Sequence, residues 1–208
     1  IEVRVTISAP ATSANLGPGF DSFGICLAGP LDTVIARRAD RGGLFMKVTG
    51  VAAGMIPSDP KGNTAGRAAL AACRMADYRG GMEIILRKGV RPGSGIGSSA
   101  ASAAAAAAAT ASLIGGLTVQ EIIEAAAEGE SASAGEEHAD NVAAAVLGGF
   151  TFVQSYSPFS AVGLSPPRAL EVAIAIPDAP TASRKTGVAR AALPERVPLG
   201  QVAHNVGG

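Results

Sequence analysis

One stretch, Arg91 to Ser112, limits what this chain can fold into more than any other. It reads RPGSGIGSSAASAAAAAAATAS, so glycine and serine are concentrated at its start and alanine follows for more than two helical turns. Alanine has the highest helix propensity, which predicts a helix from about Ser98 to Leu113. Glycine allows positive φ and leaves the main chain uncovered. The stretch therefore predicts a glycine-rich loop that leads directly into a helix.

The loop and the start of the helix together suit a bound anion. The first N–H groups of a helix have no intrahelical partner and carry partial positive charge, and a nucleotide phosphate is the usual anion at such a site. A hydroxyl at the helix start can also ligate Mg²⁺, which prefers oxygen. The expected phosphate site consists of Arg91, Pro92, Gly93, Ser94, Gly95, Ile96, Gly97, Ser98 and Ser99.

The pattern differs from the two common phosphate-binding motifs. A Walker A loop needs Gly-Lys-Ser/Thr, and no lysine follows Gly97. A dinucleotide fingerprint needs another spacing of its third glycine and a parallel strand that ends in an acidic residue. The alternative interpretation is a flexible Gly/Ser loop before an alanine-rich core helix. In either case the alanines let neighbouring segments pack close to the helix.

The composition is that of a soluble globular protein with one domain, or one domain and part of another. Of 208 residues, 48% are hydrophobic and 16% are charged, which supplies a sizeable core. Lys+Arg and Asp+Glu both number 17, which argues against a general nucleic-acid binder and against an anionic membrane as partner. Cys26 and Cys73 match no metal spacing, so the reducing cytoplasm is the expected compartment.

Alternation and turn residues predict the remaining elements. Thr118 and Glu121 have the spacing of a capping box, which predicts the start of a second helix there. Gly148 and Gly149 should end a further short helix. The expected strands cover residues 3–10, 31–39, 44–50, 81–89, about 150–156 and 171–177, with 31–39 and 44–50 as a hairpin and 11–24 as a loop. This order predicts an α+β fold with mostly antiparallel strands and helices on one face.

Three segments together resemble a known kinase family. They are PATSANLGPGFDSFG (residues 10–24), RPGSGIGSSAASAAAA (91–106) and GEEHADNVAAAVLGGF (135–150). The chain is similar to the GHMP kinases, whose shared middle motif is matched here by PGSGIGSSAA at Pro92–Ala101. The first and third segments most resemble the homoserine kinases of that family. The resemblance extends from Val3 to about Asn205, with the motifs in the family's order.

The resemblance implies a fold and a reaction. The fold is an N-terminal nucleotide-binding α+β domain like that of ribosomal protein S5, expected at residues 1–160, followed at 161–208 by the beginning of a ferredoxin-like domain. The family runs further than this chain, and its third, glycine-rich motif is absent here. The implied reaction uses ATP and Mg²⁺ to phosphorylate the hydroxyl of L-homoserine, on the route to threonine. A homodimer is a further expectation. The alternatives are another small-alcohol kinase of this family and a non-catalytic nucleotide-binding module.

The resemblance also implies roles for residues around the nucleotide. Glu130 is expected to ligate Mg²⁺ together with Ser98, whereas Glu128 fits a solvated helix end. Asn63 is expected to contact adenine, and it is equally well explained as a helix N-cap. Lys88 is expected to assist nucleotide binding, with a basic strand end at the surface as the alternative.

For the substrate, the resemblance implies two groups of residues at the ends of the chain. Asn15 and Asp21 are expected to bind homoserine, with Asp21 paired to its ammonium group, although both residue types are also ordinary in turns. Thr186 and Arg190 are expected on the other side, where the guanidinium would bind the carboxylate. The alternative for Arg190 is a solvated helix position.

The HADN segment carries the remaining expectations. His138 is expected to touch homoserine. Asn141 lies where mevalonate kinases have an Asp that acts as base, and an amide cannot accept a proton. Asp140 is either the proton acceptor or a residue that orients the loop. The preferred mechanism relies on positioning and charge neutralisation, because phosphoryl transfer has a loose transition state.

Overall fold

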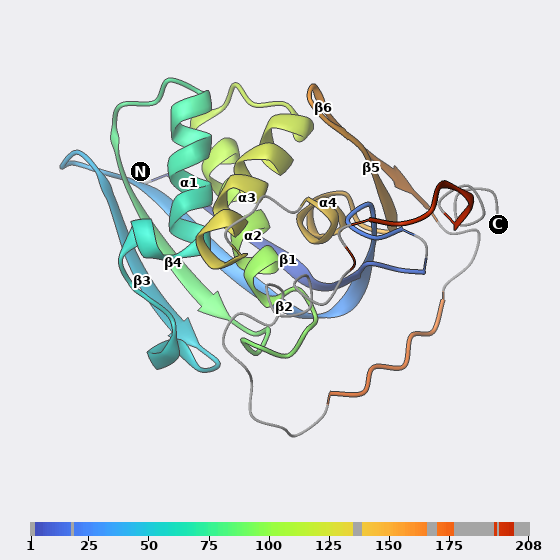
Figure 1. Cartoon of the computed structure of the whole chain (residues 1–208). Coiled ribbons are helices and arrows are strands. Elements are labelled where there is room, and N and C mark those ends of the chain that lie inside the picture. Colours follow the sequence, from blue (N-terminus) through green and yellow to red (C-terminus); the bar gives the residue numbers. More distant parts are fainter. Residues whose placement is uncertain are drawn as a thin grey trace.

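The computed structural model describes residues 3–17, 19–134, 139–165, 170–176, 194 and 196–201, with the side chains of 131–134 left aside. The strands are β1 Arg4–Ala14, β2 Phe23–Ala39, β3 Leu44–Gly50, β4 Gly81–Lys88, β5 Phe150–Tyr156 and β6 Phe159–Leu164. The α-helices are α1 Thr64–Met75, α2 Ser98–Ile114, α3 Val119–Ala134 and α4 Asp140–Leu147, and two short 3-10 helices lie at Ala53–Met55 and Pro60–Gly62. The elements form the expected α+β fold (Figure 1).

A single mixed sheet forms one layer. Its order is β3-β4-β2-β5-β6, and β1 pairs along β2 as well. Every pairing is antiparallel except that of β3 with β4. The long strand β2 pairs with β5 near its start and with β4 near its end, so it bridges the two halves of the sheet. The predicted excess of antiparallel strands is confirmed.

The four α-helices cover one face of this sheet (Figure 1). That face presents the fully buried Val34 and Ala36 of β2 and Met82, Ile84 and Leu86 of β4. Helix α2 runs through the middle of the helical layer, where nearly all its alanines are buried. Their small side chains let β1, β2 and the other helices approach α2 closely, as the alanine run predicts.

Three local expectations were wrong. Residues 31–39 and 44–50 do not form a hairpin, because β4 lies between β2 and β3 and pairs with both. Strand β4 buries Met82, Ile84 and Leu86 completely, which suits the interior of the sheet, whereas no residue of β3 is fully buried. The expected loop at 11–24 is shorter, since β1 continues to Ala14 and β2 begins at Phe23.

The third correction concerns the strand expected at 171–177. Residues 171–176 belong to no strand, and within the described part of the chain they have no strand partner. Their alternating apolar residues stay about half exposed, as Val172 at 48% and Ile174 at 45% show. Strand β6 crosses the expected domain boundary at residue 160 and pairs with β5 in the same sheet. The division at that point stays a prediction.

In the part of the chain that the structure describes, none of the helices combines the length and the apolar character needed to cross a bilayer.

Helix starts follow the sequence closely. Thr118 and Glu121 form the predicted capping box: the Thr118 amide donates to Glu121 Oε2 at 2.7 Å, and the Glu121 amide donates to Thr118 Oγ1 at 3.3 Å.

Candidate active site

The glycine-rich loop connects β4 to α2 and is open to solvent. Gly93, Gly95 and Gly97 have φ of 75°, 80° and 65°, a backbone conformation that favours glycine. Arg91, Gly93 and Gly95 are exposed. A Cβ added to Gly95 would meet no atom within 4 Å, so this side of the loop is uncovered.

The main-chain amides at the end of the loop and at the start of α2 are available to a ligand. The Ser94 amide and hydroxyl both donate to the Arg91 carbonyl, at 3.3 and 2.7 Å, which fixes a turn at the start of the loop. Within the described part of the chain, the amides of Gly95, Ile96, Gly97, Ser98 and Ser99 donate no hydrogen bond. Gly97 is the N-cap of α2 and supplies no side-chain cap. This is the geometry that an anion site at a helix N-terminus requires.

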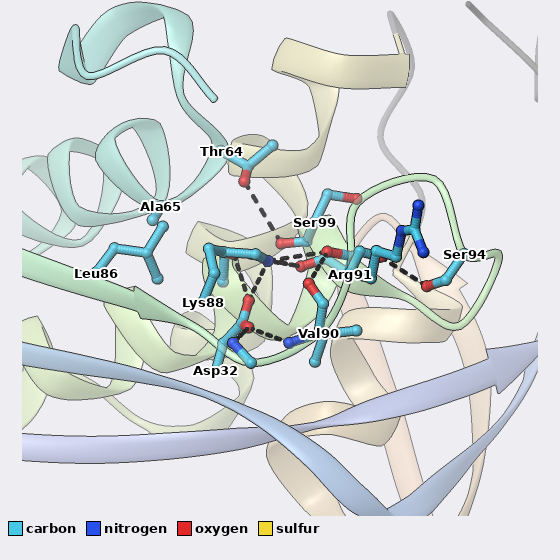
Figure 2. Close-up of polar contacts among 12 residues, drawn as sticks. Asp32, Thr64, Ala65, Leu86, Lys88, Val90, Arg91, Ser94 and Ser99 are labelled. Atoms are coloured by element: carbon cyan, nitrogen blue, oxygen red, sulfur yellow. Dashed lines mark hydrogen bonds and ion pairs between the residues drawn. The ribbon is translucent and has the colours of Figure 1, made fainter. Parts of the chain in front are cut away.

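Lys88 lies beneath this loop and not on the surface, so the alternative of a surface strand end was wrong. Its side chain is 2% exposed and pairs with Asp32. Its ammonium group also donates to the carbonyl and hydroxyl of Ser98, at 2.8 and 2.9 Å, and to the Ser102 hydroxyl at 2.8 Å. Burial lowers the pKa of Lys88, and the charge of Asp32 opposes that shift. Figure 2 shows Lys88 and Asp32 at the centre of this network.

Glu130 contacts the second serine of the motif, not the first. Ser99 donates its hydroxyl to Glu130 Oε2 at 3.0 Å, whereas Ser98 donates to the Val90 carbonyl at 2.8 Å and faces Lys88. Burial raises the pKa of Glu130 to about 7. The Ser99 hydrogen bond opposes this rise, the charge of Asp140 adds to it, and the charge of Lys88 opposes it. The structure therefore brings Glu130 beside Ser99, and the expected role of Ser98 as a Mg²⁺ ligand stays a prediction.

Glu128 occupies a different environment from Glu130, although both lie on α3. It forms a two-pronged ion pair with Arg74 of α1, at 2.8 and 2.5 Å. This interaction lowers the pKa of Glu128. Gly129, between them, lets α1 and α3 touch, because a Cβ there would lie 2.6 Å from the Thr64 carbonyl oxygen.

The donor set around Glu130 fits Mg²⁺. Two buried carboxylates, Glu130 and Asp140, repel each other, and a hydroxyl group lies at hydrogen-bonding distance from the first. The described residues contain no group of three or more His, Cys, Asp or Glu side chains that could enclose a metal ion. Such a sparse set of oxygen ligands suits Mg²⁺, which keeps several waters and shares substrate phosphates. The residues that would hold it are Glu130 and Ser99.

Thr12 joins the three motif segments, and sequence reasoning missed it. Its amide donates to the Ile96 carbonyl at 3.1 Å, and its fully buried hydroxyl donates to Asn141 Oδ1 at 2.8 Å. Gly97 is required at this junction, because a Cβ there would lie 2.1 Å from Thr12 Oγ1. The only sequence signal was the position of Thr12 inside the first resembling segment.

Asp140 and Asn141 start α4 beside the phosphate loop. Asp140 is 1% exposed, and its Oδ1 accepts from the Asn141 amide at 2.7 Å and from Asn141 Nδ2 at 3.3 Å. These contacts orient the Asn141 side chain, whose Oδ1 already accepts from Thr12. A Cβ on Gly24 would lie 2.3 Å from the Asp140 carbonyl oxygen, so the start of β2 packs directly on α4.

Asn15 and Asp21 form a compact N-terminal loop. Both have left-handed φ, 58° and 55°, and Asn15 Oδ1 accepts from the Asp21 amide at 2.9 Å. Tyr156 links this loop to α4. Its hydroxyl donates to the Asp21 carbonyl at 3.2 Å and accepts from the Ala139 amide at 3.4 Å. Two segments expected to bind the substrate are thereby held together.

The structure supports the capping alternative for Asn63. The side chain is 2% exposed, and its Oδ1 accepts from the amides of Ala65 and Gly66 at 2.9 and 3.4 Å. Its Nδ2 donates to the Pro57 carbonyl at 2.7 Å. A contact of Asn63 with adenine stays a prediction. His138, Thr186 and Arg190 lie outside the described residues, as does Pro18 of the first segment.

Comparisons with known proteins agree with this geometry. The family described as GHMP kinases N terminal domain matches residues 63–149. A homoserine kinase of Methanococcus vannielii is 38% identical over 205 residues, covering 98% of this chain and 66% of that protein. One of Halobacterium salinarum is 45% identical over 203 residues, covering 97% of this chain and 62% of that protein. The chain spans about two thirds of the length of the curated relatives it matches.

Solved structures give the same result. The crystal structure of homoserine kinase from Cytophaga hutchinsonii superimposes with a TM-score of 0.81 at 34% identity, covering 98% of this chain and 64% of that one. The mevalonate kinase of Methanococcus jannaschii superimposes with a TM-score of 0.60 at 12% identity, covering 79% of this chain and 56% of that one. That second likeness concerns the fold alone. By its sequence, its fold and the placement of its motifs, the chain belongs to the GHMP kinase family.

Proposed function

We propose that the protein is a homoserine kinase, which transfers the γ-phosphoryl group of ATP to the hydroxyl of L-homoserine. The observation that carries this proposal is the open loop before α2, where the amides of residues 95–99 donate no hydrogen bond within the described part of the chain. The relatives that match nearly the whole chain are named homoserine kinases, which supports the choice of substrate. The cytoplasmic compartment and the homodimer stay predictions.

The loop amides and the start of α2 would bind the β- and γ-phosphates of ATP. Their partial positive charge points at the groups on which negative charge accumulates, and it is fixed before the reaction begins. Ser99 and Glu130 would hold Mg²⁺, which neutralises phosphate charge when bound. Burial raises the pKa of Glu130 to about 7, and a bound cation would favour the ionised form of this carboxylate.

The substrate hydroxyl would be positioned between α4 and the N-terminal loop. Its oxygen forms a bond to the γ-phosphorus while the bond to the ADP oxygen breaks. Asn141 cannot accept the proton, and its amide is held by Thr12 and Asp140. Asp140 is the remaining proton-acceptor candidate, but its Oδ1 accepts two hydrogen bonds from Asn141. We therefore favour positioning and charge neutralisation as the main source of rate, which a loose transition state permits, with the proton of the hydroxyl passing to an oxygen of the transferred phosphoryl group or to water.

The test is an ADP-coupled assay of the full-length gene product with ATP and Mg²⁺. Homoserine kinase activity requires turnover with L-homoserine and little with mevalonate or shikimate. Turnover on one of these alcohols but not on homoserine would assign another substrate within the family. Tight ATP binding without turnover on any alcohol would indicate a non-catalytic nucleotide-binding module.

A further inference from the structure

Asp32 is a buried acid to which neither the motifs nor the proposed reaction gives a role. It lies in β2, outside all three resembling segments, and its side chain is fully buried. A buried carboxylate is costly unless it is paired and hydrogen-bonded. Asp32 meets both conditions, and each of its partners belongs to the entrance or the exit of the phosphate loop.

One oxygen of Asp32 holds the main chain where it leaves β4. Oδ1 accepts from the amides of Gly89 and Val90, at 2.8 and 2.9 Å. The backbone of β2 also touches this point, since a Cβ on Gly89 would lie 2.1 Å from the Leu31 carbonyl oxygen. The residues immediately before Arg91 are therefore fixed to β2, as Figure 2 shows for Asp32 and Val90.

The other oxygen of Asp32 reaches the first turns of α2. Oδ2 accepts from the Ser102 hydroxyl at 2.6 Å and from the Lys88 ammonium group. Lys88 in turn donates to the carbonyl and the hydroxyl of Ser98, the first residue of α2. One carboxylate thus holds both ends of the loop at 91–97, directly on one side and through Lys88 and Ser102 on the other.

We propose that Asp32 is a positioning residue for the triphosphate loop, which it fixes in its ATP-binding shape through Gly89, Val90, Ser102 and Lys88. This inference rests on the proposed function. It has a physical reason: the loop contains three left-handed glycines, and glycine has the largest backbone freedom to lose when a loop becomes ordered. Because both ends of the loop are anchored, the loop loses less conformational entropy when ATP binds.

The main test compares Asp32→Asn with Val34→Ala. Val34 lies two residues further along β2 and is also fully buried, so its truncation destabilises the core without touching the loop. Asparagine keeps one acceptor for the amides of Gly89 and Val90 but loses the charge opposite Lys88. We expect Asp32→Asn to weaken ATP binding by about tenfold or more, because small displacements of positioning groups have effects of this size. Val34→Ala should bind ATP as the wild type does.

The kinetic readout separates positioning from general damage. In Asp32→Asn, KM for ATP should rise while KM for homoserine stays the same, since the partners of Asp32 in the described part of the chain lie at the two ends of the phosphate loop and outside the segments expected to bind homoserine. Equal changes in both KM values, or the same loss of ATP affinity in Val34→Ala, would show that Asp32 serves stability alone. Unchanged ATP affinity in a folded Asp32→Asn protein would overturn the proposal.

A second variant keeps the test decisive if Asp32→Asn does not fold. Ser102→Ala removes the hydrogen bond that Ser102 donates to Asp32 and the one that it accepts from Lys88, and it leaves the ion pair between Asp32 and Lys88 intact. We expect ATP affinity to fall by about threefold to tenfold, with faster amide hydrogen exchange in peptides covering residues 89–99 of the ATP-free protein. Wild-type affinity and exchange in Ser102→Ala would overturn the proposal. If wild-type protein itself binds no ATP, the proposed function fails instead, so the two failures are distinct.

Discussion

At the scale of single residues, Glu130 gives the site a defined response to pH. The pKa of its carboxyl is raised from 4.5 to about 7, chiefly by burial, so the folded protein keeps a proton that the unfolded chain releases above pH 4.5. The stability that Glu130 contributes in its protonated form is therefore lost as the pH rises from 4.5 through 7. The loss is about 3 kcal/mol, because each pKa unit between 4.5 and 7 corresponds to about 1.4 kcal/mol.

We expect Glu130→Gln to flatten this slope in the metal-free protein, because glutamine has no proton to lose. Urea unfolding at pH 5 and at pH 8 measures it. Glu128→Gln is the matched control on the same helix: Arg74 lowers the pKa of Glu128, so its contribution is present above its unfolded pKa and is lost only in acid. An unchanged slope in Glu130→Gln would contradict the assignment of the raised pKa to Glu130.

The glycines of the loop allow a second prediction at this scale. Gly95 has φ of 80° and open space around it, whereas at Gly97 a Cβ would collide with Thr12. Gly95→Val should fold and weaken ATP binding sharply, because a branched side chain strains the loop and keeps phosphate from its amides. Calorimetric titration with ATP measures this. If Gly95→Val binds ATP with wild-type affinity, this loop is not the phosphate site.

At the scale of elements, the sequence predicted what is local and missed what depends on partners. The starts of α1, α2 and α3 were predicted because Asn63 and Thr118 satisfy nearby amides and alanine favours the helix. The hairpin at 31–50 was wrong because alternation identifies a strand but not its neighbour. For the same reason residues 171–176 of the strand expected at 171–177 form no strand, since they have no strand partner within the described part of the chain.

The junction between β5, the N-terminal loop and α4 gives a prediction for the substrate side. Tyr156→Phe removes the hydroxyl that bridges Asp21 and Ala139 and keeps the ring that packs on Phe159. We expect KM for homoserine to rise by about threefold to tenfold, the effect of one or two modest hydrogen bonds, while KM for ATP stays the same. Phe159→Leu is the control, because it alters the packing and leaves the hydroxyl. A rise in KM for ATP, with KM for homoserine unchanged, would show that Tyr156 does not position the homoserine site.

At the scale of the whole molecule, the candidate site exists only because distant segments meet. The motif order on the chain says which segments matter, and the resemblance names their roles. Neither indicates that Lys88 is buried or that Ser99, not Ser98, faces Glu130. Those facts depend on the rotation of α2 about its own axis, which decides which side chains face β2 and β4. The sequence does not specify this rotation, because alanine occupies almost every face of the helix.

The contact of Thr12 with Asn141, 129 residues apart, tests this long-range assembly directly. Thr12→Val keeps the shape of the side chain and removes its hydroxyl. The partly buried Oδ1 of Asn141 then loses the hydrogen bond that Thr12 donates. We expect a loss of about 1–3 kcal/mol in the free energy of unfolding. Thr12→Ser, which keeps the hydroxyl, should lose much less. In a double-mutant cycle, Thr12→Val and Asn141→Ala should couple by at least about 0.5 kcal/mol. Additive effects would mean that the junction does not hold the first strand to α4, and that the three motifs reach the site by other contacts.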